Sequence, residues 1–215
     1  MVFARYCNEM ESIEIMDLVS TCLDCDEGRT LRTAFLNSWR DFANRPALVV
    51  DGGTFTFDQL GRSAASLAAT LQACGVAGGP ELTAVFAHRS HTAFAGVLGA
   101  LLSGDGYVPL NPTFPTDRTA TMLVRAGCRK VIVDRHSAGQ LEEVLAGIDE
   151  ELALVFPDHE DVSDFVSRFP GHKVIGAMDL ARAGEWIPSQ VDPDAVAYLL
   201  FTSGSTGIPK GAMVA

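Results

Sequence analysis

The sequence predicts an α/β fold in which helices flank a mostly parallel sheet. Short apolar runs at 82–87, 107–110 and 130–133 are typical of buried strands. The segment 92–103 lies between the first two runs and is apolar nearly all round, so we expect a buried helix there. A strand, a buried helix and a second strand within this length form a βαβ unit, whose two strands are parallel.

The composition excludes several classes of protein. The chain has 215 residues, 47% of them hydrophobic, which suits one folded domain of ordinary size or slightly more rather than a disordered chain. A net charge of −11 disfavours nucleic acids and anionic membranes as partners, because both require clustered lysine and arginine. The longest apolar run, 93–102, is about half as long as a membrane-spanning helix.

The first 29 residues show little periodicity, and we treat 1–29 as an N-terminal segment of unknown role that precedes a domain at 30–215. A short helix is expected there only at 10–18. Acidic residues and the lack of an apolar core argue against a secretory signal peptide, so the five cysteines are expected to be reduced thiols in the cytoplasm. Cys22 and Cys25 form a C-x-x-C pair without further ligands at zinc-site spacing, and an inert pair is favoured over a redox pair.

Signals for helices and turns continue along the chain. Thr56 and Gln59 have the spacing of a capping box at the start of a helix that Gly75 ends, and Phe55 and Leu60 are placed for a hydrophobic staple. Further helices are expected at 31–43, 117–126 and 137–148, further strands at 47–51, 54–55, 152–155 and 174–175, and turns at 52–53 and 181–184.

Two groups of polar residues have ordinary interpretations. His88 and His91 are too closely spaced for a metal pair and lack an accompanying carboxylate, so they are expected to be exposed loop histidines. Glu150, Glu151 and the acids of 158–164 could form a general acid/base or metal pair. A solvated face is favoured, since these acids cluster without positioned partners.

The stretch that carries chemistry begins with an apolar run at 196–201. Residues 202–206 are all small, and four of the five carry hydroxyl groups. Gly204 and Gly207 allow a ligand to approach the backbone closely, and Lys210 adds one compact cation. Such a loop after a strand suits an anionic phosphate chain, which backbone N–H groups, hydroxyls and a lysine can bind together. The spacing matches neither Walker A nor the Rossmann motif, so a Ser/Gly-rich surface loop without a ligand is the remaining alternative.

The sequence TSGSTGIPKG at 202–211 resembles the signature phosphate loop of the adenylate-forming superfamily. This superfamily comprises acyl-CoA synthetases, the adenylation domains of nonribosomal peptide synthetases, and luciferases. Residues 104–118, with three prolines, are similar to a second core motif in the form found in amino-acid-activating domains, which usually have aspartate where this chain has Asn111. Residues 55–60 are similar to an early core motif whose role is packing. The resemblance covers about 31–215, with the motifs in the family's order.

This resemblance implies an incomplete N-terminal large domain of the adenylate-forming fold. In the superfamily a substrate carboxylate attacks the α-phosphate of ATP, usually with Mg²⁺, pyrophosphate leaves, and the acyl-adenylate then passes its acyl group to a thiol. The substrate would be a carboxylic acid, with an amino acid favoured, and the acceptor a phosphopantetheine carrier protein or coenzyme A. Lys210 would act in catalysis. The nucleotide phosphates would be lined by Thr202, Ser203, Gly204, Ser205, Thr206, Gly207 and Lys210.

The chain stops at Ala215, before the positions at which the superfamily has its Mg²⁺-binding glutamate motif, its ribose-binding aspartate and its C-terminal lid. No metal ligand is therefore assigned within this chain. We expect residues 1–215 alone not to be a competent ligase, but a fragment, a truncated product or half of a split enzyme. The alternatives are a nucleotide-binding or regulatory fragment without catalysis, and an interaction module that keeps the fold.

Overall fold

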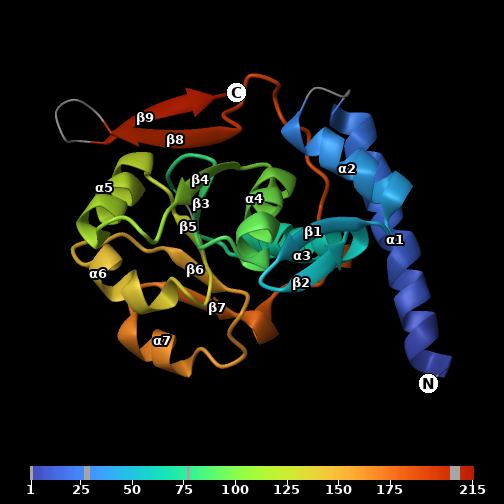
Figure 1. The fold of residues 1–215 in the computed structure, drawn as a ribbon, viewed down its shortest axis with the longest axis horizontal. Helices are drawn as coiled ribbons and strands as arrows, with labels where there is room; N and C mark the ends of the chain where they lie inside the picture. The colour runs from blue at the N-terminus through green and yellow to red at the C-terminus, as the bar shows by residue number, and fades with distance from the viewer. Residues whose placement is uncertain (1, 27–29, 77, 204–208) are drawn as a thin grey trace.

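The computed structural model of the protein describes residues 2–26, 30–76, 78–203 and 209–215, with side chains from residue 14 onward except that of Ser203. At its centre is a seven-stranded sheet in the order β7-β6-β5-β3-β4-β8-β9 (Figure 1). The strands are β3 (Leu82–Phe86), β4 (Gly106–Leu110), β5 (Lys130–Val133), β6 (Ala153–Phe156), β7 (Lys173–Gly176), β8 (Tyr198–Ser203) and β9 (Pro209–Val214). Neighbouring strands are parallel except β8 and β9, so the expected α/β fold with a mostly parallel sheet is confirmed.

Helices cover both faces of this sheet. The main ones are α3 (Phe57–Ala73) and α4 (His91–Ser103) on one face, and α5 (Thr116–Ala126), α6 (Leu141–Leu145) and α7 (Ser163–Arg168) on the other. Successive side chains of a strand point to opposite faces. Val131 and Val133 of β5 therefore pack in the core cluster that contains α5, α6 and α7, whereas Ile132 packs with α3 and α4. The β3–α4–β4 crossover thus lies on the face opposite to the β4–α5–β5 crossover.

A small hairpin leads into α3 as the sequence predicts. Strands β1 (Pro46–Val50) and β2 (Gly53–Thr56) are antiparallel. Thr56 Oγ1 accepts a hydrogen bond from the Gln59 N–H at 3.2 Å, and the Thr56 N–H donates to Gln59 Oε1 at 2.9 Å, which confirms the capping box. The turn lies one residue earlier than expected, at Asp51 and Gly52, because these two residues hold the positive φ angles of 51° and 72°.

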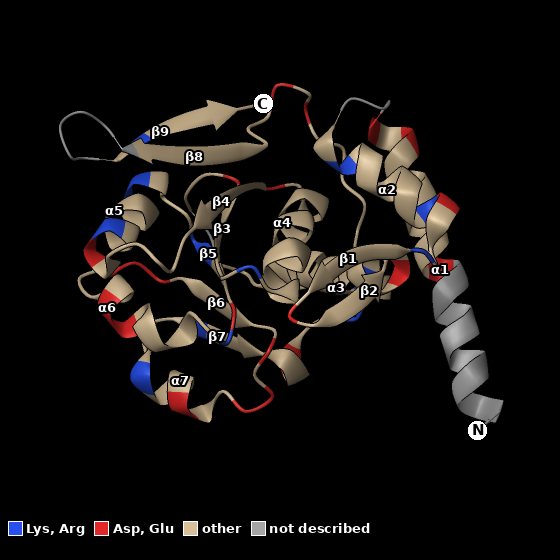
Figure 2. Ribbon diagram, in the orientation of Figure 1, with Lys and Arg blue, Asp and Glu red and all other residues tan. Residues whose placement is uncertain are grey.

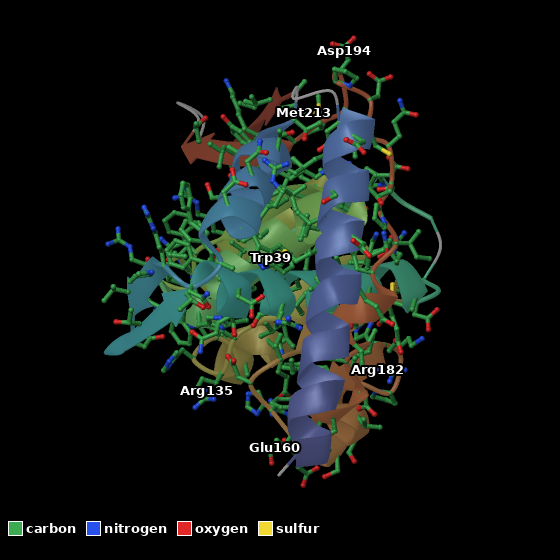
Figure 3. All side chains as sticks on the ribbon, turned by 90° about the vertical axis from the view of Figure 1, so that its right-hand side faces the viewer. Trp39, Arg135, Glu160, Arg182, Asp194 and Met213 are labelled. Atoms are coloured by element: carbon green, nitrogen blue, oxygen red, sulfur yellow. The ribbon has the colours of Figure 1, made fainter. Side chains whose placement is uncertain are left out.

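The N-terminal segment differs most from expectation. Instead of a short helix at 10–18 it forms α1 (Val2–Asp26), a helix of 25 residues that runs along the side of the molecule (Figure 3). Ile15 and Val19 of α1 are completely buried with Leu36 and Trp39 of α2 (Leu31–Phe42). Helices gain most of their stability from such tertiary packing, so the weak periodicity of the segment misled the prediction. Among the described residues, no helix has both the length and the apolarity needed to cross a membrane.

Three further elements depart from the expected pattern. The helix expected at 137–148 is a short 3₁₀ turn, η1 (Ala138–Gln140), followed by α6 of five residues, and the chain turns away at Gly147, whose φ is 83°. Helix α7 was not predicted, because six residues are too few to show a helical period. Helix α4 is not buried all round: Phe94 is 43% exposed, since it lines an open groove beside β8.

A long segment joins β7 to β8 across the α3–α4 face. It contains η2 (Ala177–Asp179) and η3 (Ala183–Glu185), the second of which occupies the expected turn. Trp186 is 1% exposed and donates from Nε1 to the Leu102 carbonyl at 2.8 Å. The Gln72 side chain of α3 donates to the Ile187 carbonyl at 2.8 Å and accepts from the Ile187 N–H at 3.1 Å. These contacts hold the segment against the helices until it enters β8.

Candidate functional site

The hairpin of β8 and β9 holds both ends of the predicted phosphate loop. The antiparallel register pairs Thr202 with Lys210 and Ser203 with Pro209. Thr202 Oγ1 also donates to the Lys210 carbonyl at 3.4 Å across the pair. The chain therefore leaves the sheet after Ser203 and re-enters it at Pro209 on the neighbouring strand. Thr202 and Lys210, which are eight positions apart in sequence, become direct neighbours.

The hairpin opens at the carboxyl edge of the parallel part of the sheet. Strand β8 is parallel to β4 and in register with it at Tyr107 and Tyr198, whose rings are 5.6 Å apart. In open α/β sheets, ligands bind outside the carboxyl ends of the strands. The two ends of the predicted loop, Ser203 and Pro209, thus lie at the edge where this class of fold places its ligands.

The central residues of the predicted site lie outside the described part of the chain. These residues are Gly204, Ser205, Thr206 and Gly207. The structure describes Ser203 only as the last residue of β8, and Thr202 and Lys210 as exposed side chains beside it. The assignment of all seven residues to nucleotide phosphates therefore stays a prediction.

Two cations border the hairpin. Lys210 is exposed and, within the described residues, its ammonium group takes part in no ion pair. Arg125, near the end of α5, donates from Nη1 to the Pro209 carbonyl at 3.2 Å. Figure 2 shows these basic segments at the start of β9 and at the end of α5 beside it. Arg125 could not be identified from the sequence, because only the folded chain brings α5 next to β9.

An apolar groove adjoins the hairpin on the α4 side of the sheet. It has a volume of about 670 Å³. Its apolar wall is formed by Val97, Phe94, Pro109, Phe114, Leu200 and Phe201, and its polar rim includes His88, Arg89 and Asn111. The proline-rich stretch 104–118 supplies one side of this groove.

Asn111 has a local structural role in that stretch. Its Oδ1 accepts hydrogen bonds from the N–H and the hydroxyl of Thr113, both at 2.9 Å. An aspartate carboxylate would accept the same two bonds, as in an Asx turn. The departure from the usual aspartate at this position therefore preserves the backbone path, and it removes one negative charge from the rim of the groove.

The donor groups of the hairpin fit a phosphate chain, whereas the described residues show no metal site. Thr202 offers a hydroxyl and Lys210 an ammonium group, which are both donors that suit phosphate oxygens. Within residues 14–26, 30–76, 78–202 and 209–215, no three His, Cys, Asp or Glu side chains lie together as ligands for a metal ion. The expected Mg²⁺ therefore stays a prediction.

The C-x-x-C pair lies on α1 and has the character of an inert pair. Cys22 is completely buried, and burial raises the pKa of its thiol to about 12. A thiol with so high a pKa is almost entirely protonated at neutral pH, and the thiolate is the reactive form. Cys25 is half-buried, and both residues have free thiols.

The two histidines singled out from sequence have different surroundings. His88 is exposed in the loop after β3, as expected. For His91 the expectation is wrong, because it is the first residue of α4, is half-buried and packs on Phe55 with ring centroids 4.3 Å apart. Burial lowers the pKa of His91, and the nearby Asp158 carboxylate opposes this effect only in part. His91 lines a second cavity of about 570 Å³ between α3, α4 and η3.

The acidic surface expected at 158–164 is also only partly exposed. Asp158 is half-buried, and its carboxylate accepts hydrogen bonds from the Thr92 hydroxyl at 2.6 Å and from the Arg135 N–H at 3.1 Å. It therefore joins the start of α4 to the loop after β5. Glu150, Glu151 and Glu160 are exposed, as expected for a solvated face.

Comparison with known proteins identifies similar sequences. A family described as "AMP-binding enzyme" matches residues 35–215. Phenyloxazoline synthase MbtB of Mycobacterium tuberculosis is 33% identical over 186 residues, which are 86% of this chain and 11% of that protein. Tyrocidine synthase 3 of Brevibacillus parabrevis is 30% identical over 197 residues, which are 91% of this chain and 3% of that protein. The chain thus spans only a small part of the curated relatives it matches.

Solved structures share the fold. The Vibrio cholerae adenylation domain AlmE, in complex with glycyl-adenosine-5′-phosphate, matches with a TM-score of 0.72 and 25% identity, covering 86% of this chain and 35% of that one. IdnL7 matches with a TM-score of 0.69 and 28% identity, covering 86% of this chain and 34% of that one. The chain therefore corresponds to about a third of these solved proteins.

Proposed function

The chain belongs to the family of AMP-binding enzymes, and on that premise we propose that it is the N-terminal part of an ATP-dependent ligase that activates a carboxylic acid as an acyl-adenylate. An amino acid is the favoured substrate. The thiol that receives the acyl group would belong to a phosphopantetheine carrier protein or to coenzyme A, and the reaction would take place in the cytoplasm. We also keep the division of the chain into a segment at 1–29 and the adenylation domain at 30–215 as a proposal.

One observation carries the proposal: the β8–β9 hairpin pairs Thr202 with Lys210 at the mouth of the predicted phosphate loop. The hairpin lies at the carboxyl edge of the parallel strands, where this class of sheet binds ligands. A hydroxyl and a cation thus flank a loop whose glycines allow phosphate oxygens to approach the backbone N–H groups.

The proposed roles of the residues follow from the charge that develops in the reaction. The carboxylate attacks the α-phosphorus of ATP, the bond to pyrophosphate breaks, and negative charge grows on the leaving group. Thr202, Ser203 and the loop 204–207 would bind and orient the phosphates by hydrogen bonds. Lys210 would neutralise the charge on the pyrophosphate side, which stabilises the transition state more than the ground state.

Support for an amino acid comes from two sources. The stretch 104–118 resembles the form of its motif found in amino-acid-activating domains. One matching structure, that of AlmE, is in complex with glycyl-adenosine-5′-phosphate, which is an aminoacyl adenylate. The apolar groove beside the hairpin does not by itself select between an amino acid and another carboxylic acid.

The test is ATP–pyrophosphate exchange by the full-length gene product, with a panel of amino, aryl and fatty acids. We expect exchange that depends on an amino acid, and a loss of about 10²–10³-fold in Lys210→Ala, the size of effect seen when one transition-state donor is removed. Arg40→Ala is the matched control, because Arg40 is an exposed cation whose ion pair is with its neighbour Asp41. A folded protein that shows no exchange with any acid would overturn the proposal.

A second candidate function for residues 1–215 is nucleotide binding without catalysis. It is favoured because this chain covers only part of each matching solved structure. Because the chain corresponds to about a third of those domains, we propose that exchange requires residues outside that third. The candidate predicts that ATP raises the melting temperature of residues 1–215, since a ligand that binds only the folded state stabilises it. The shift should vanish in Lys210→Ala. An interaction module would show no nucleotide effect in either protein.

A further inference from the structure

Four basic side chains gather at the carboxyl ends of two neighbouring strands. His88 and Arg89 follow β3, and Arg135 and His136 follow β5, with all four side chains exposed. The rings of His88 and His136 meet edge to face with centroids 6.0 Å apart, although the residues are 48 positions apart in sequence. Arg135 lies at the periphery of the molecule (Figure 3). We refer to these four residues as the basic cluster.

The basic cluster lies where the chain connections change from one face of the sheet to the other. Strands β3 and β5 are adjacent and parallel. After β3 the chain passes to α4 on one face of the sheet, and after β5 it passes to α6 on the opposite face. Where two adjacent strands send their connections to opposite faces, open α/β sheets bind ligands at the carboxyl edge. The basic cluster lines this switch point.

A buried carboxylate fixes the two loops in place. Asp134 is completely buried and accepts hydrogen bonds from the His88 N–H and the Ser90 hydroxyl, both at 2.9 Å. It also accepts from the N–H of Ser137 at 2.9 Å and from the hydroxyl of the same residue at 2.6 Å. One carboxylate therefore joins the loop after β3 to the loop after β5. This buried contact therefore fixes the distance between the two loops that carry the basic cluster.

The charge of the basic cluster is not balanced by ion pairs. In the described part of the chain, none of its four side chains forms a salt bridge. Two carboxylates bond to the loops that carry the cluster: Asp134 accepts the four bonds given above, and Asp158 accepts from the Thr92 hydroxyl and the Arg135 N–H. Among the described residues, the Arg135 guanidinium makes only a long contact of 3.5 Å, to the Asp158 carbonyl. Arg89 and Arg135 are cations, and their lack of an ion pair among the described residues of a chain with a net charge of −11 favours an anionic ligand at this edge.

The basic cluster is separate from the phosphate loop but connected to it by the groove. Strand β4 lies between β3 and β8, so two strand spacings of about 4.8 Å place the loop after β3 roughly 10 Å from the hairpin. His88 and Arg89 line the same groove as Leu200 and Phe201 of β8. An extended molecule in the groove could place one end at the hairpin and the other at the basic cluster.

We propose that the basic cluster binds a phosphate group at a site distinct from the loop at 202–210. Arginine guanidinium groups bind phosphate oxygens through paired N–H donors, and the imidazoles add further donors. The proposed site does not include Lys210, so its test is independent of the test of the proposed adenylation site.

The first test uses inorganic phosphate as the probe and the imidazole ¹H–¹⁵N resonances of residues 1–215 as the readout. The five histidines make these spectra simple to assign. We expect saturable shifts of His88 and His136, and no shift of His172, which lies near β7. Arg89→Gln and Arg135→Gln should each weaken binding about tenfold, the usual effect of losing one charge-assisted hydrogen bond. Both arginines are exposed, and circular dichroism should show both variants folded.

Two variants separate this site from the phosphate loop and from general charge effects. Lys210→Ala and Arg40→Gln should leave the shifts of His88 and His136 unchanged. The absence of saturable shifts, equal binding in Arg89→Gln and Arg135→Gln, or loss of binding in Lys210→Ala would overturn the proposal.

Further ligands identify the source of the phosphate. If 4′-phosphopantetheine binds the basic cluster more tightly than both inorganic phosphate and pantetheine, the phosphate belongs to the thiol acceptor. The groove then holds the pantetheine arm. If, in the Lys210→Ala variant, ATP binds the basic cluster more tightly than inorganic phosphate does, the phosphate belongs to a second nucleotide. Equal binding of all phosphates assigns the site to the free anion.

Discussion

Arg32 and Asp26 form an ion pair that is almost completely withdrawn from water. Nη2 lies 2.5 Å from Oδ1 and Nε lies 2.8 Å from Oδ2, with side chains that are 1% and 0% exposed. The same guanidinium donates to the backbone carbonyls of Leu101 and Ser189. One side chain therefore joins the end of α1 and the start of α2 to α4 and to the segment that leads into β8. The N-terminal helix is thereby joined to the layer of helices that covers one face of the sheet.

Removal of the Asp26 charge should strongly destabilise the protein. Asp26→Asn keeps the shape but leaves a guanidinium buried without its carboxylate, which typically costs about 3–5 kcal/mol. Urea unfolding followed by circular dichroism measures the loss. The control Asp41→Asn removes the exposed partner of Arg40 and should leave the midpoint unchanged. Equal midpoints for Asp26→Asn and the wild type would show that the buried pair contributes nothing.

The same carboxyl should make stability depend on pH in the acid range. Burial raises the pKa of Asp26, but the hydrogen bonds from Arg32 and Thr30 outweigh it and hold the pKa below its usual value. Its contribution is therefore complete above the unfolded pKa of about 4 and is lost as pH falls through the lower folded value. The difference in unfolding free energy between wild type and Asp26→Asn should shrink below about pH 4. Urea titrations at a series of pH values measure it, and a constant difference would contradict this assignment.

Gly61 allows α3 to pack directly on Trp39. A Cβ atom at this position would lie 2.3 Å from two ring carbons of Trp39, which is itself completely buried. Gly61→Ala should lower stability by about 1–3 kcal/mol as an overpacked contact, although alanine is the better helix former. Gly139→Ala is the control, because a Cβ there meets nothing within 4 Å. Thermal unfolding of the two variants separates packing from propensity, and similar melting temperatures would refute the packing argument.

Cys22 should resist alkylation in the folded protein. Burial raises the pKa of Cys22 to about 12 from an ordinary value of 9.0, so its thiolate is about a thousandfold rarer near neutral pH. The half-buried Cys25 should react first with iodoacetamide, and Cys22 only after denaturant is added. Mass spectrometry of peptides after timed quenching measures both rates. Equal rates in the native protein would mean that α1 leaves the core on the time scale of the reaction.

The core strands could be predicted from sequence to within a residue or two, because each is a short apolar run bounded by polar residues or glycine. The capping box of Thr56 and Gln59 was equally accessible, since both partners lie within one turn of helix. Helix α1 could not be found in the same way. Its stability comes from contacts of Ile15 and Val19 with residues of α2, and these do not appear as a period within the segment.

In the candidate site too, features within one segment could be predicted from sequence, and features that join distant segments could not. A phosphate-binding role for the loop at 202–210 is predicted from residue types alone, because glycines, hydroxyls and a lysine follow one strand. Arg125, the groove and the basic cluster could not be seen, since their members come from different strands and helices. His91 was misassigned because its neighbours Phe55 and Asp158 are distant in sequence.

The sequence by itself determined the core strands and the capping box of α3, and it predicts a phosphate-binding loop, because all three depend on residues that are neighbours along the chain. The tertiary structure alone decided which loops share an edge. Parallel strands are joined by crossovers, so their order in the sheet and the face of each crossover are set by packing of the whole core. That order brings the loops after β3, β5 and β8 to one edge of the sheet.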